Sequence, residues 1–338
     1  MRGSSTTAAV DSDESAEQPV DRAKAFTRVR EAIWFEPLVA FGIIAVLLLS
    51  IFAFTSNWPP AYVVESRSMQ HGYDDHPGLI NTGDLVLAQK VPTGTIIPYV
   101  VAQRTGYTTY GENGDVLLYR PNDDSSTSPI IHRSILFLEF NTNGTYSAPD
   151  LNGLACGKVA DALFSANSTG VHSGCSTLGI KGVLTLFHVG WQSVTVQIPL
   201  DPSTLGGALG GYSGFITMGD NNLDSGMGEP DQTFGISHLV APGWVIGVAR
   251  GMIPWFGALK LGLQGNASEV PAQSWQYMGI SLTGTLLAVL GVHLIHRKQR
   301  RDREGRGPDR ATGAEEPPRS LAPPAPFDRP GGTERGKS

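Results

Sequence analysis

The sequence predicts a mainly β protein, in which an antiparallel β domain lies between two transmembrane helices. Two apolar stretches without Asp, Glu, Lys or Arg stand toward the ends of the chain, at 38–54 and 275–295. The long segment between them consists of short β-branched and apolar runs bounded by Gly, Pro, Asn and Asp, a pattern typical of strands joined by turns. Only 157–167 has a fair helical pattern. The expected strands are 61–65, 84–90, 115–119, 130–140, 183–189, 193–199, 215–218 and 244–249.

Both apolar stretches are long enough to serve as membrane anchors. They contain 17 and 21 residues, and a helix needs about 20 to cross the hydrocarbon core. A cleavable signal peptide is the alternative for the first stretch, but that stretch begins behind a polar tail of 37 residues and no small-residue cleavage site follows it. We therefore expect two retained helices. Aromatic residues that suit the membrane interface stand at their ends: Trp34, Trp58, Trp275 and Tyr277.

Basic residues outside the two stretches set the orientation, because Lys and Arg gather on the cytoplasmic side of a span. They precede the first stretch and follow the second: Arg22, Lys24, Arg28, Arg30, Arg297, Lys298, Arg300, Arg301 and Arg303. This predicts a multi-pass protein of the cell membrane, with both termini in the cytoplasm and 57–257 outside as the β domain. We expect 1–37 and 296–338, which are polar or rich in Arg, Pro and Gly, to be disordered, and 258–274 to be a linker.

The charge of the outer segment excludes nucleic acid as a partner. Residues 57–272 contain 17 Asp and Glu against 9 Lys and Arg, whereas phosphate binding needs clustered basic residues. Only 7 of the 25 basic residues of the chain are Lys. An acidic, Lys-poor surface suits a high-salt organism such as a haloarchaeon, and a GC-rich genome would produce the same Arg bias.

Residues 141–211 differ in composition from their surroundings and look like an insertion. They are rich in Gly, Ser, Thr and Asn, and they contain both cysteines, Cys156 and Cys175. Outside the membrane an even number of cysteines favours a disulfide, and two free thiols are the alternative. Three Asn-x-Ser/Thr sequons in the outer segment are candidate glycosylation sites: Asn143, Asn167 and Asn266.

Three strings in the outer segment supply a hydroxyl, an imidazole and a carboxylate, the ingredients of a serine hydrolase. They are SRSM at 66–69, IIHR at 130–133 and GDNN at 219–222. Each also has an ordinary interpretation, as a solvated turn, a core strand with a structural histidine, and a hairpin turn. His71 and His76 stand near two carboxylates, but nothing fixes a ligand geometry, so we assign no metal and no cofactor.

Together, and in this order, the three strings resemble type I signal peptidases of the archaeal and endoplasmic-reticulum branch. That family follows its Ser-Met turn with a Gly-Asp-apolar strand, which matches NTGDLVLA at 81–88. Bacterial members use a lysine as the base, and this chain has none between Lys90 and Lys158. The resemblance covers 57–140 and 213–257, and it leaves the insertion without a role.

The resemblance implies a role for each site residue. Ser68, directly before Met69, would be the nucleophile, and Ser66 would join the Ser68 backbone N–H in an oxyanion hole. His132 would be the general base, since a serine hydroxyl needs a neighbouring group to take its proton. Asp220 would orient His132 or hold the strands of the site in register.

The family also has a second carboxylate a few residues downstream, and here Asp224 and Asp231 compete for it. The residues after Asp231 are closer to the family pattern, and that alignment makes 223–230 a small insertion. His71 stands where the family usually has Pro, so the turn after the nucleophile is longer. The string IPWFG at 253–257 resembles the end of the family's catalytic domain, and its aromatic side chains suit docking onto lipid.

The resemblance therefore implies a membrane-bound serine endopeptidase that removes signal peptides from exported preproteins. Its expected partners are these signal peptides, with small side chains at positions −1 and −3, the lipid bilayer, and the Sec translocon. One alternative is a catalytically degenerate, membrane-anchored β domain that binds a surface partner. Another is a general surface protease of the same fold. The presence of both Ser68 and His132 favours an enzyme.

Overall fold

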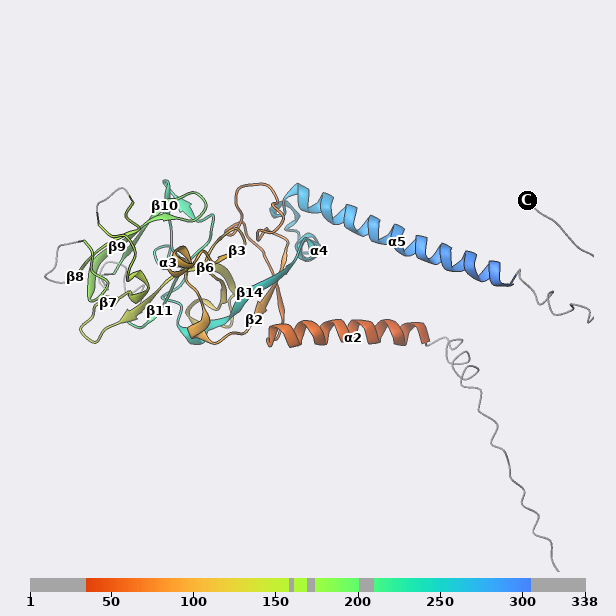
Figure 1. Ribbon diagram of the computed structural model, residues 1–338, viewed down its shortest axis with the longest axis horizontal. Coiled ribbons are helices and arrows are strands. Elements are labelled where there is room, and N and C mark those ends of the chain that lie inside the picture. The colour runs from red at the N-terminus through yellow and green to blue at the C-terminus, as the bar shows by residue number, and fades with distance from the viewer. Residues whose placement is uncertain (1–34, 158–160, 169–173, 201–209, 305–338) are drawn as a thin grey trace, which may run out of the picture. The chain divides into compact units, whose positions relative to one another are not determined.

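In the computed structural model, the described chain forms a large sheet (Figure 1). In the sequence, the strands of this sheet lie between two long helices. The structure describes residues 35–157, 161–168, 174–200 and 210–304. The sheet has 12 strands. They are β1 (Ala61–Val63), β2 (Leu85–Gln89), β5 (Val116–Tyr119), β6 (Ile130–Phe140), β7 (Tyr146–Ser147), β8 (Phe164–Ser168), β9 (Ile180–Val189), β10 (Val194–Pro199), β11 (Gly214–Met218), β12 (Leu223–Asp224), β13 (Met227–Gly228) and β14 (Val245–Ile253).

The pairing of these strands confirms the predicted sheet-dominated, antiparallel class. Among the named strands, only β10 and β13 pair in parallel, and the order is β1-β2-β14-β5-β6-β7-β9-β10-β13-β12, with β11 beside β6 and β8 beside β9. β3 (Thr108–Thr109) and β4 (Glu112–Asn113) form a separate two-stranded ladder. All eight expected strands are present, with ends that shift by a few residues.

The described chain has fewer α-helices than strands. They are α2 (Phe35–Thr55), α3 (Tyr99–Thr105), α4 (Phe256–Leu263) and α5 (Ala272–Glu304), and the single 3-10 turns are η1 (Thr93–Thr95), η2 (Pro121–Asp123), η3 (Pro149–Leu151), η4 (Pro242–Trp244) and η5 (Ala267–Glu269). The chain divides after Ile280 into two compact units, and α5 crosses that division. The description of the sheet and its sites below concerns the first unit.

Strand β6 organises the site because it pairs on both sides. Its first residues pair with β5, with His132 opposite Leu117, and from Arg133 onward it also pairs with β11. Apart from the polar residues 132–134 and Glu139, its sequence IIHRSILFLEF is apolar or aromatic, as a strand buried on both faces requires. The polar pair at its start therefore lies in the interior of the sheet.

The described residues of the segment 141–211 contribute strands to the main sheet and side chains to its core. Strands β7 to β10 of this segment contribute Phe164, Leu184 and Val196 to one buried cluster, which also contains Leu136 of β6 and Ile216 of β11. Burial of this apolar area stabilises the fold by roughly 25 cal/mol per Å². The segment is therefore joined to the rest of the domain through a shared core.

The helix expected at 157–167 is wrong where the structure describes it, because Phe164–Ser168 is the strand β8. Phe164 and Ala166 are buried while Ser165 is half exposed, which is the period of two of a strand. β8 pairs with β9, and its flanks are joined by the Cys156–Cys175 disulfide, so the predicted pairing is confirmed. Residues 158–160 of the expected helix lie outside the described residues.

The linker expected at 258–274 is also wrong. Its first half completes α4, and Ala258 and Leu261 of that helix are buried with Val270 against Val63 and Trp275. This cluster ties the segment to β1, the strand that leads to Ser68. A run of apolar residues at helical spacing explains why the segment packs rather than spans open solvent.

Two helices are long and apolar enough to cross a membrane, at Pro37–Thr55 and Ala272–Gln299. They contain the two stretches predicted as spans. Helix α2 includes residues 35–37, and α5 continues to Glu304, so the disorder expected there and at 296–304 is wrong. Arg, Lys, Gln and Glu are good helix formers and let α5 continue beyond its apolar part. The remainder of the two tails lies outside the described residues.

Candidate active site

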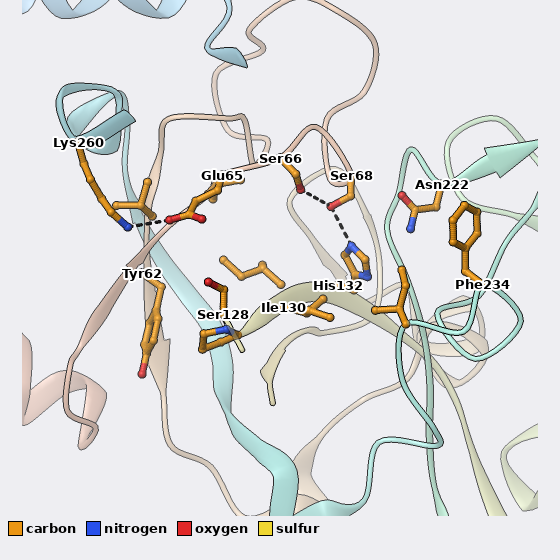
Figure 2. Close-up of a pocket in the computed structure, with 15 residues that line it drawn as sticks. Tyr62, Glu65, Ser66, Ser68, Ser128, Ile130, His132, Asn222, Phe234 and Lys260 are labelled. Carbon is orange, nitrogen blue, oxygen red and sulfur yellow. Dashed lines mark hydrogen bonds and ion pairs between the residues drawn. The ribbon is translucent and has the colours of Figure 1, made fainter. Parts of the chain in front are cut away.

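Ser68, His132 and Asp231 form a continuous chain of hydrogen bonds. His132 Nε2 lies 2.8 Å from Ser68 Oγ, and His132 Nδ1 lies 2.7 Å from Asp231 Oδ1 and 2.8 Å from Oδ2 (Figure 2 shows the Ser68–His132 pair). Because Nδ1 faces a carboxylate, that nitrogen carries the proton and donates it. Nε2 is then free to accept the Ser68 hydroxyl proton, which is the arrangement that activates a serine nucleophile.

Each member of this chain stands where the backbone is firmly held. Ser68 lies in a turn closed by a hydrogen bond from Gln70 N to Arg67 O (3.0 Å), and the next side chain, Met69, is 2 % exposed and anchors the turn in a buried apolar cluster. His132 is fixed by the pairing of β6 with β5. Asp231 is fixed by its backbone N–H, which donates to Thr217 O (2.9 Å).

The carboxylate of Asp231 is fully buried and is surrounded by neutral donors. Tyr119 donates its hydroxyl to Oδ2 (2.6 Å), and the Thr217 hydroxyl donates to the same oxygen (2.6 Å). Burial, reinforced by the Asp231 charge, raises the pKa of Tyr119 well above its usual value, so the phenol remains a donor. The two hydroxyls, with the His132 ring, compensate a charge that would otherwise be costly to bury.

Asp220 has a different partner, because its carboxylate pairs with Arg133. Arg133 Nε and Nη2 each lie 2.7 Å from one carboxylate oxygen, and both side chains are almost completely buried. Burial alone would raise the pKa of Asp220, but the charge and hydrogen bonds of Arg133, together with the smaller effect of His71, outweigh burial and lower that pKa. The side-chain partners of Asp220 are Arg133 and His71, and His132 is bonded to Asp231 instead. Of its two expected roles the structure therefore favours the one that holds strands together.

The turn that contains Asp220 lies directly against Ser68. Asn221 N donates to Ser68 O (2.8 Å). Gly219 approaches so closely that a Cβ there would lie 2.6 Å from the same carbonyl oxygen, which explains why the position holds glycine. Residues 219–222 therefore support the backbone of Ser68, and Asp220 fixes this turn to β6 through Arg133.

Two further predicted residues are placed as follows. Ser66 is exposed, and its hydroxyl lies 3.1 Å from Ser68 Oγ, so it stands beside the reacting atom as an oxyanion donor must. Asp224 lies in the exposed hairpin of β12 and β13, where it accepts a bond from the Ser225 hydroxyl. Of the two competing carboxylates, the structure brings Asp231 to His132 and leaves Asp224 at the surface.

A cleft of about 520 Å³ opens beside Ser68 and His132 (Figure 2). One wall is formed by residues 62–66, which continue from β1, and the other by residues 128–132 at the start of β6. Asn222 and Phe234 line one end of the cleft and Lys260 the other. The reacting atoms thus lie along a groove whose walls are extended backbone.

The first wall presents unpaired backbone groups to the cleft. Toward β2, Val64 N donates to Asp84 O and Pro60 O accepts from Ala88 N. In an antiparallel pair the bonded residues alternate, so the N–H and C=O groups of Val63 point the other way, toward the cleft.

The second wall has the same property. Ser134 N donates to Asp115 O, and the register places His132 and Ile130 as the next residues that bond to β5. The backbone groups of Ile131 therefore face away from β5, ahead of the point where β11 begins to pair with β6 at Arg133. The cleft lies between two free strand edges.

The candidate glycosylation sites are at the surface where their side chains are described. Asn143 and Asn266 are exposed, and the Asn143 amide oxygen accepts a bond from the Thr145 hydroxyl of its own sequon (2.7 Å). Asn167 lies in β8, and its side chain lies outside the described residues. Among the described residues, no group of three His, Cys, Asp or Glu is placed to hold a metal ion.

Sequence reasoning missed the residues that support this site from other strands. Tyr119 and Thr217 bind Asp231, and Trp191 donates its indole N–H to Asp220 O (3.1 Å). The one signal for such a support was Tyr119 at the end of the apolar run VLLY, because a buried tyrosine hydroxyl needs a hydrogen-bond partner. Arg133 was visible in the IIHR string, but nothing there identified its partner.

No protein-family model, curated protein or solved structure matches this chain. The functional assignment therefore depends on the geometry of the site and on the motifs that carry it.

Proposed function

We propose that this protein is a membrane-anchored serine endopeptidase that removes signal peptides from exported preproteins. The observation that carries the proposal is the hydrogen-bonded chain Ser68–His132–Asp231, which opens onto a groove with free strand edges. The motif order, which resembles that of type I signal peptidases, supports the same assignment. An intact chain of three groups is also not expected of a degenerate binding domain.

The geometry supports an acyl-enzyme mechanism. His132 Nε2 takes the Ser68 hydroxyl proton as Ser68 Oγ attacks the scissile carbonyl carbon, and the tetrahedral oxyanion lies between the Ser68 N–H and the Ser66 hydroxyl. His132 then gives the proton to the leaving amine. A water molecule, deprotonated by the same imidazole, releases the acyl group from Ser68. Asp231 keeps the imidazole in the required tautomer and stabilises its charged form.

The groove favours a substrate in extended conformation. A peptide that lies between the two walls can add as a strand, with main-chain bonds to Val63 on one side and to Ile131 on the other. Such bonds do not depend on the side chains of the substrate, so the shape of the groove near Ser68 would set the choice at positions −1 and −3. This is how one site could accept many preproteins.

The two apolar helices support a location at the membrane. Helix α2 ends at Thr55, close in sequence to the nucleophile strand, and α4 packs on the first turn of α5 through Leu261 and Trp275. We place both termini in the cytoplasm and the sheet outside, as the basic residues beyond the spans favour. Signal peptides, the bilayer and the Sec translocon are then the proposed partners.

The test is cleavage of a preprotein by membranes that carry the wild type, Ser68→Ala or His132→Ala, with mass spectrometry of the products. We expect the wild type to produce one new N-terminus and both variants to lose at least about 10⁴-fold in rate. Ser225→Ala, which removes an exposed hydroxyl, is the matched control and should cleave normally. Undiminished processing by Ser68→Ala would exclude the mechanism, and cleavage at many unrelated sites would favour a general surface protease.

A further inference from the structure

The nucleophile turn depends on residues 219–222, and these residues need an external support. Asn221 N holds the Ser68 carbonyl, so the orientation of the Ser68–Met69 peptide follows the position of this turn. The Asp220 side chain is fixed by Arg133. Its backbone carbonyl is bound by a residue from a distant part of the chain.

That residue is Trp191, which belongs to the segment 141–211. Its indole N–H donates to Asp220 O (3.1 Å). Its ring stacks on the imidazole of His71, with 5.2 Å between ring centroids and 12° between planes. His71 Nε2 in turn lies 3.2 Å from Asp220 Oδ2. Two groups that touch each other thus contact both the main chain and the side chain of Asp220.

The position of Trp191 is itself set by the fold. It lies in the tight connection between β9 and β10, whose turn is closed by Ser193 N donating to Gly190 O (2.9 Å). Tyr99 of α3 clamps this turn, because its hydroxyl donates to His188 O (3.3 Å) and accepts from Gly190 N (3.0 Å). The hairpin therefore presents the indole at a fixed place.

The same hairpin also packs on the chain that follows the turn. β10 pairs with β13, and a Cβ at Gly228 would lie 2.8 Å from Val196 Cγ2. Trp191 is nevertheless 39 % exposed. It belongs to none of the buried apolar clusters of the described residues, so its contacts with Asp220 and His71 are its distinguishing feature.

We infer that Trp191 is a positioning residue for the catalytic serine, and that the segment 141–211 acts on the active site through it. The inference rests on the proposed function. The indole holds Asp220 O, Asp220 and Asn221 hold the turn, and Asn221 N holds Ser68 O. The segment 141–211, which resembles no family feature, thus supports Ser68 through the turn 219–222.

The test compares Trp191→Phe with the wild type in the detergent-solubilised full chain. Phenylalanine keeps a ring to stack on His71 but removes the N–H donor. One hydrogen bond is worth roughly 1 kcal/mol, so we expect kcat for a preprotein to fall about five- to tenfold, with KM within about twofold. The Asn221 amide should exchange its hydrogen several-fold faster. Trp58→Phe, at a tryptophan that is 74 % exposed, is the matched control and should change neither value.

The outcomes separate the two proposals. If the wild type cleaves and Trp191→Phe has the same kcat and the same Asn221 exchange, the inference is wrong and the proposed function stands. If KM alone rises, Trp191 acts on substrate binding and the positioning role is also wrong. Failure of the wild type to cleave any preprotein contradicts the proposed function itself.

Discussion

Asp220 follows β11 and Asp231 follows β13, and both carboxylates are buried, yet they have different partners. Asp220 makes two bonds to the guanidinium of Arg133, a group that cannot lose its proton in a protein. Asp231 faces the imidazole of His132, whose two ring nitrogens can pass a proton from one partner to another. One carboxylate is locked in a permanent ion pair, and the other is joined to a group that can carry a proton.

This difference shows how one short stretch of chain can serve both structure and chemistry. The Asp220–Arg133 pair fixes the turn that supports Ser68, and nothing in it needs to change during a reaction. The Asp231 carboxylate has no fixed positive charge among its bonded partners, so in the proposed mechanism it would stabilise a charge that develops on His132. The predictions below test this division.

The largest effect is expected at Asp231. Asp231→Asn keeps the size of the side chain but removes the charge and disturbs the tautomer of His132, so we expect kcat to fall about 10⁴-fold. Preprotein cleavage at saturating substrate measures it. The matched control is Asp224→Asn, an exposed carboxylate, for which the rate should remain within about twofold of the wild type. Equal losses of kcat in the two variants would contradict the role of Asp231 in the Ser68–His132–Asp231 chain.

Asp220→Asn should act on stability first. Breaking a buried ion pair leaves Arg133 uncompensated and costs about 3–5 kcal/mol in the free energy of unfolding, which denaturant titration measures. The folded pKa of Asp220 is lowered, so the pair stabilises the protein above the usual carboxyl pKa and this stability is lost as pH falls through the folded pKa. The variant should therefore lose less stability on acidification. A large loss of kcat at unchanged stability would reverse the roles of the two carboxylates.

Asp84 offers a third buried carboxylate, with neither an arginine nor an imidazole as partner. Burial raises its pKa to about 6, and the nearby Asp75 adds to this effect, against bonds from Trp255 N and Asn81 N that lower it. A raised carboxyl pKa stabilises the fold below the usual value and loses that contribution as pH rises through the folded one. Between pH ~4 and ~6 the wild type should lose up to about 3 kcal/mol from this group.

The measurement is the thermal midpoint as a function of pH for the wild type and Asp84→Asn. We expect a flatter curve over this range in the variant, whatever its absolute stability. An unchanged slope would mean that Asp84 is as well compensated as Asp220, and that an arginine is not needed to hold a buried carboxylate in this sheet.

The smallest effect is expected at Tyr119, which donates a hydrogen bond to Asp231. Tyr119→Phe removes one of two hydroxyl donors to Asp231 Oδ2 and leaves the packing of β5 intact. A hydrogen bond to a charged group contributes about 1.5–3 kcal/mol, and Thr217 remains, so we expect kcat to fall about tenfold. A loss as large as that of Asp231→Asn would show that the phenol itself takes part in proton transfer.

The sequence predicted the parts of this molecule that depend on local pattern. The strands follow from β-branched and apolar runs bounded by turn residues, and Ser68 and His132 follow from short motifs. Asp231 was one of two competing candidates, and the structure distinguishes them by the bond of Asp231 to His132. The strand β8 was misread because Lys-Val-Ala-Asp-Ala-Leu before it contains good helix formers. The disulfide and the pairing with β9 overrode that local preference.

The supports of the site could not be predicted, because they join residues far apart in the chain. Arg133 and Asp220 are separated by 87 positions, and Tyr119 and Asp231 by 112. Such pairs depend on strand register, which a single sequence does not specify. Trp191 was harder still, since its hairpin lies in the segment with no family counterpart.

The most direct test of the Ser68–His132–Asp231 chain replaces the Ser68 hydroxyl by a thiol and measures the reactivity of that thiol. In Ser68→Cys the introduced thiol is the one free cysteine, because the chain's two native cysteines form a disulfide. The pH dependence of its alkylation by iodoacetamide reports its ionisation. A thiol paired with a histidine ionises well below the ordinary pKa of about 8.5. We predict a midpoint below pH ~7 in Ser68→Cys that moves to about 8.5 when His132→Ala is added. A midpoint near 8.5 in both would contradict the account.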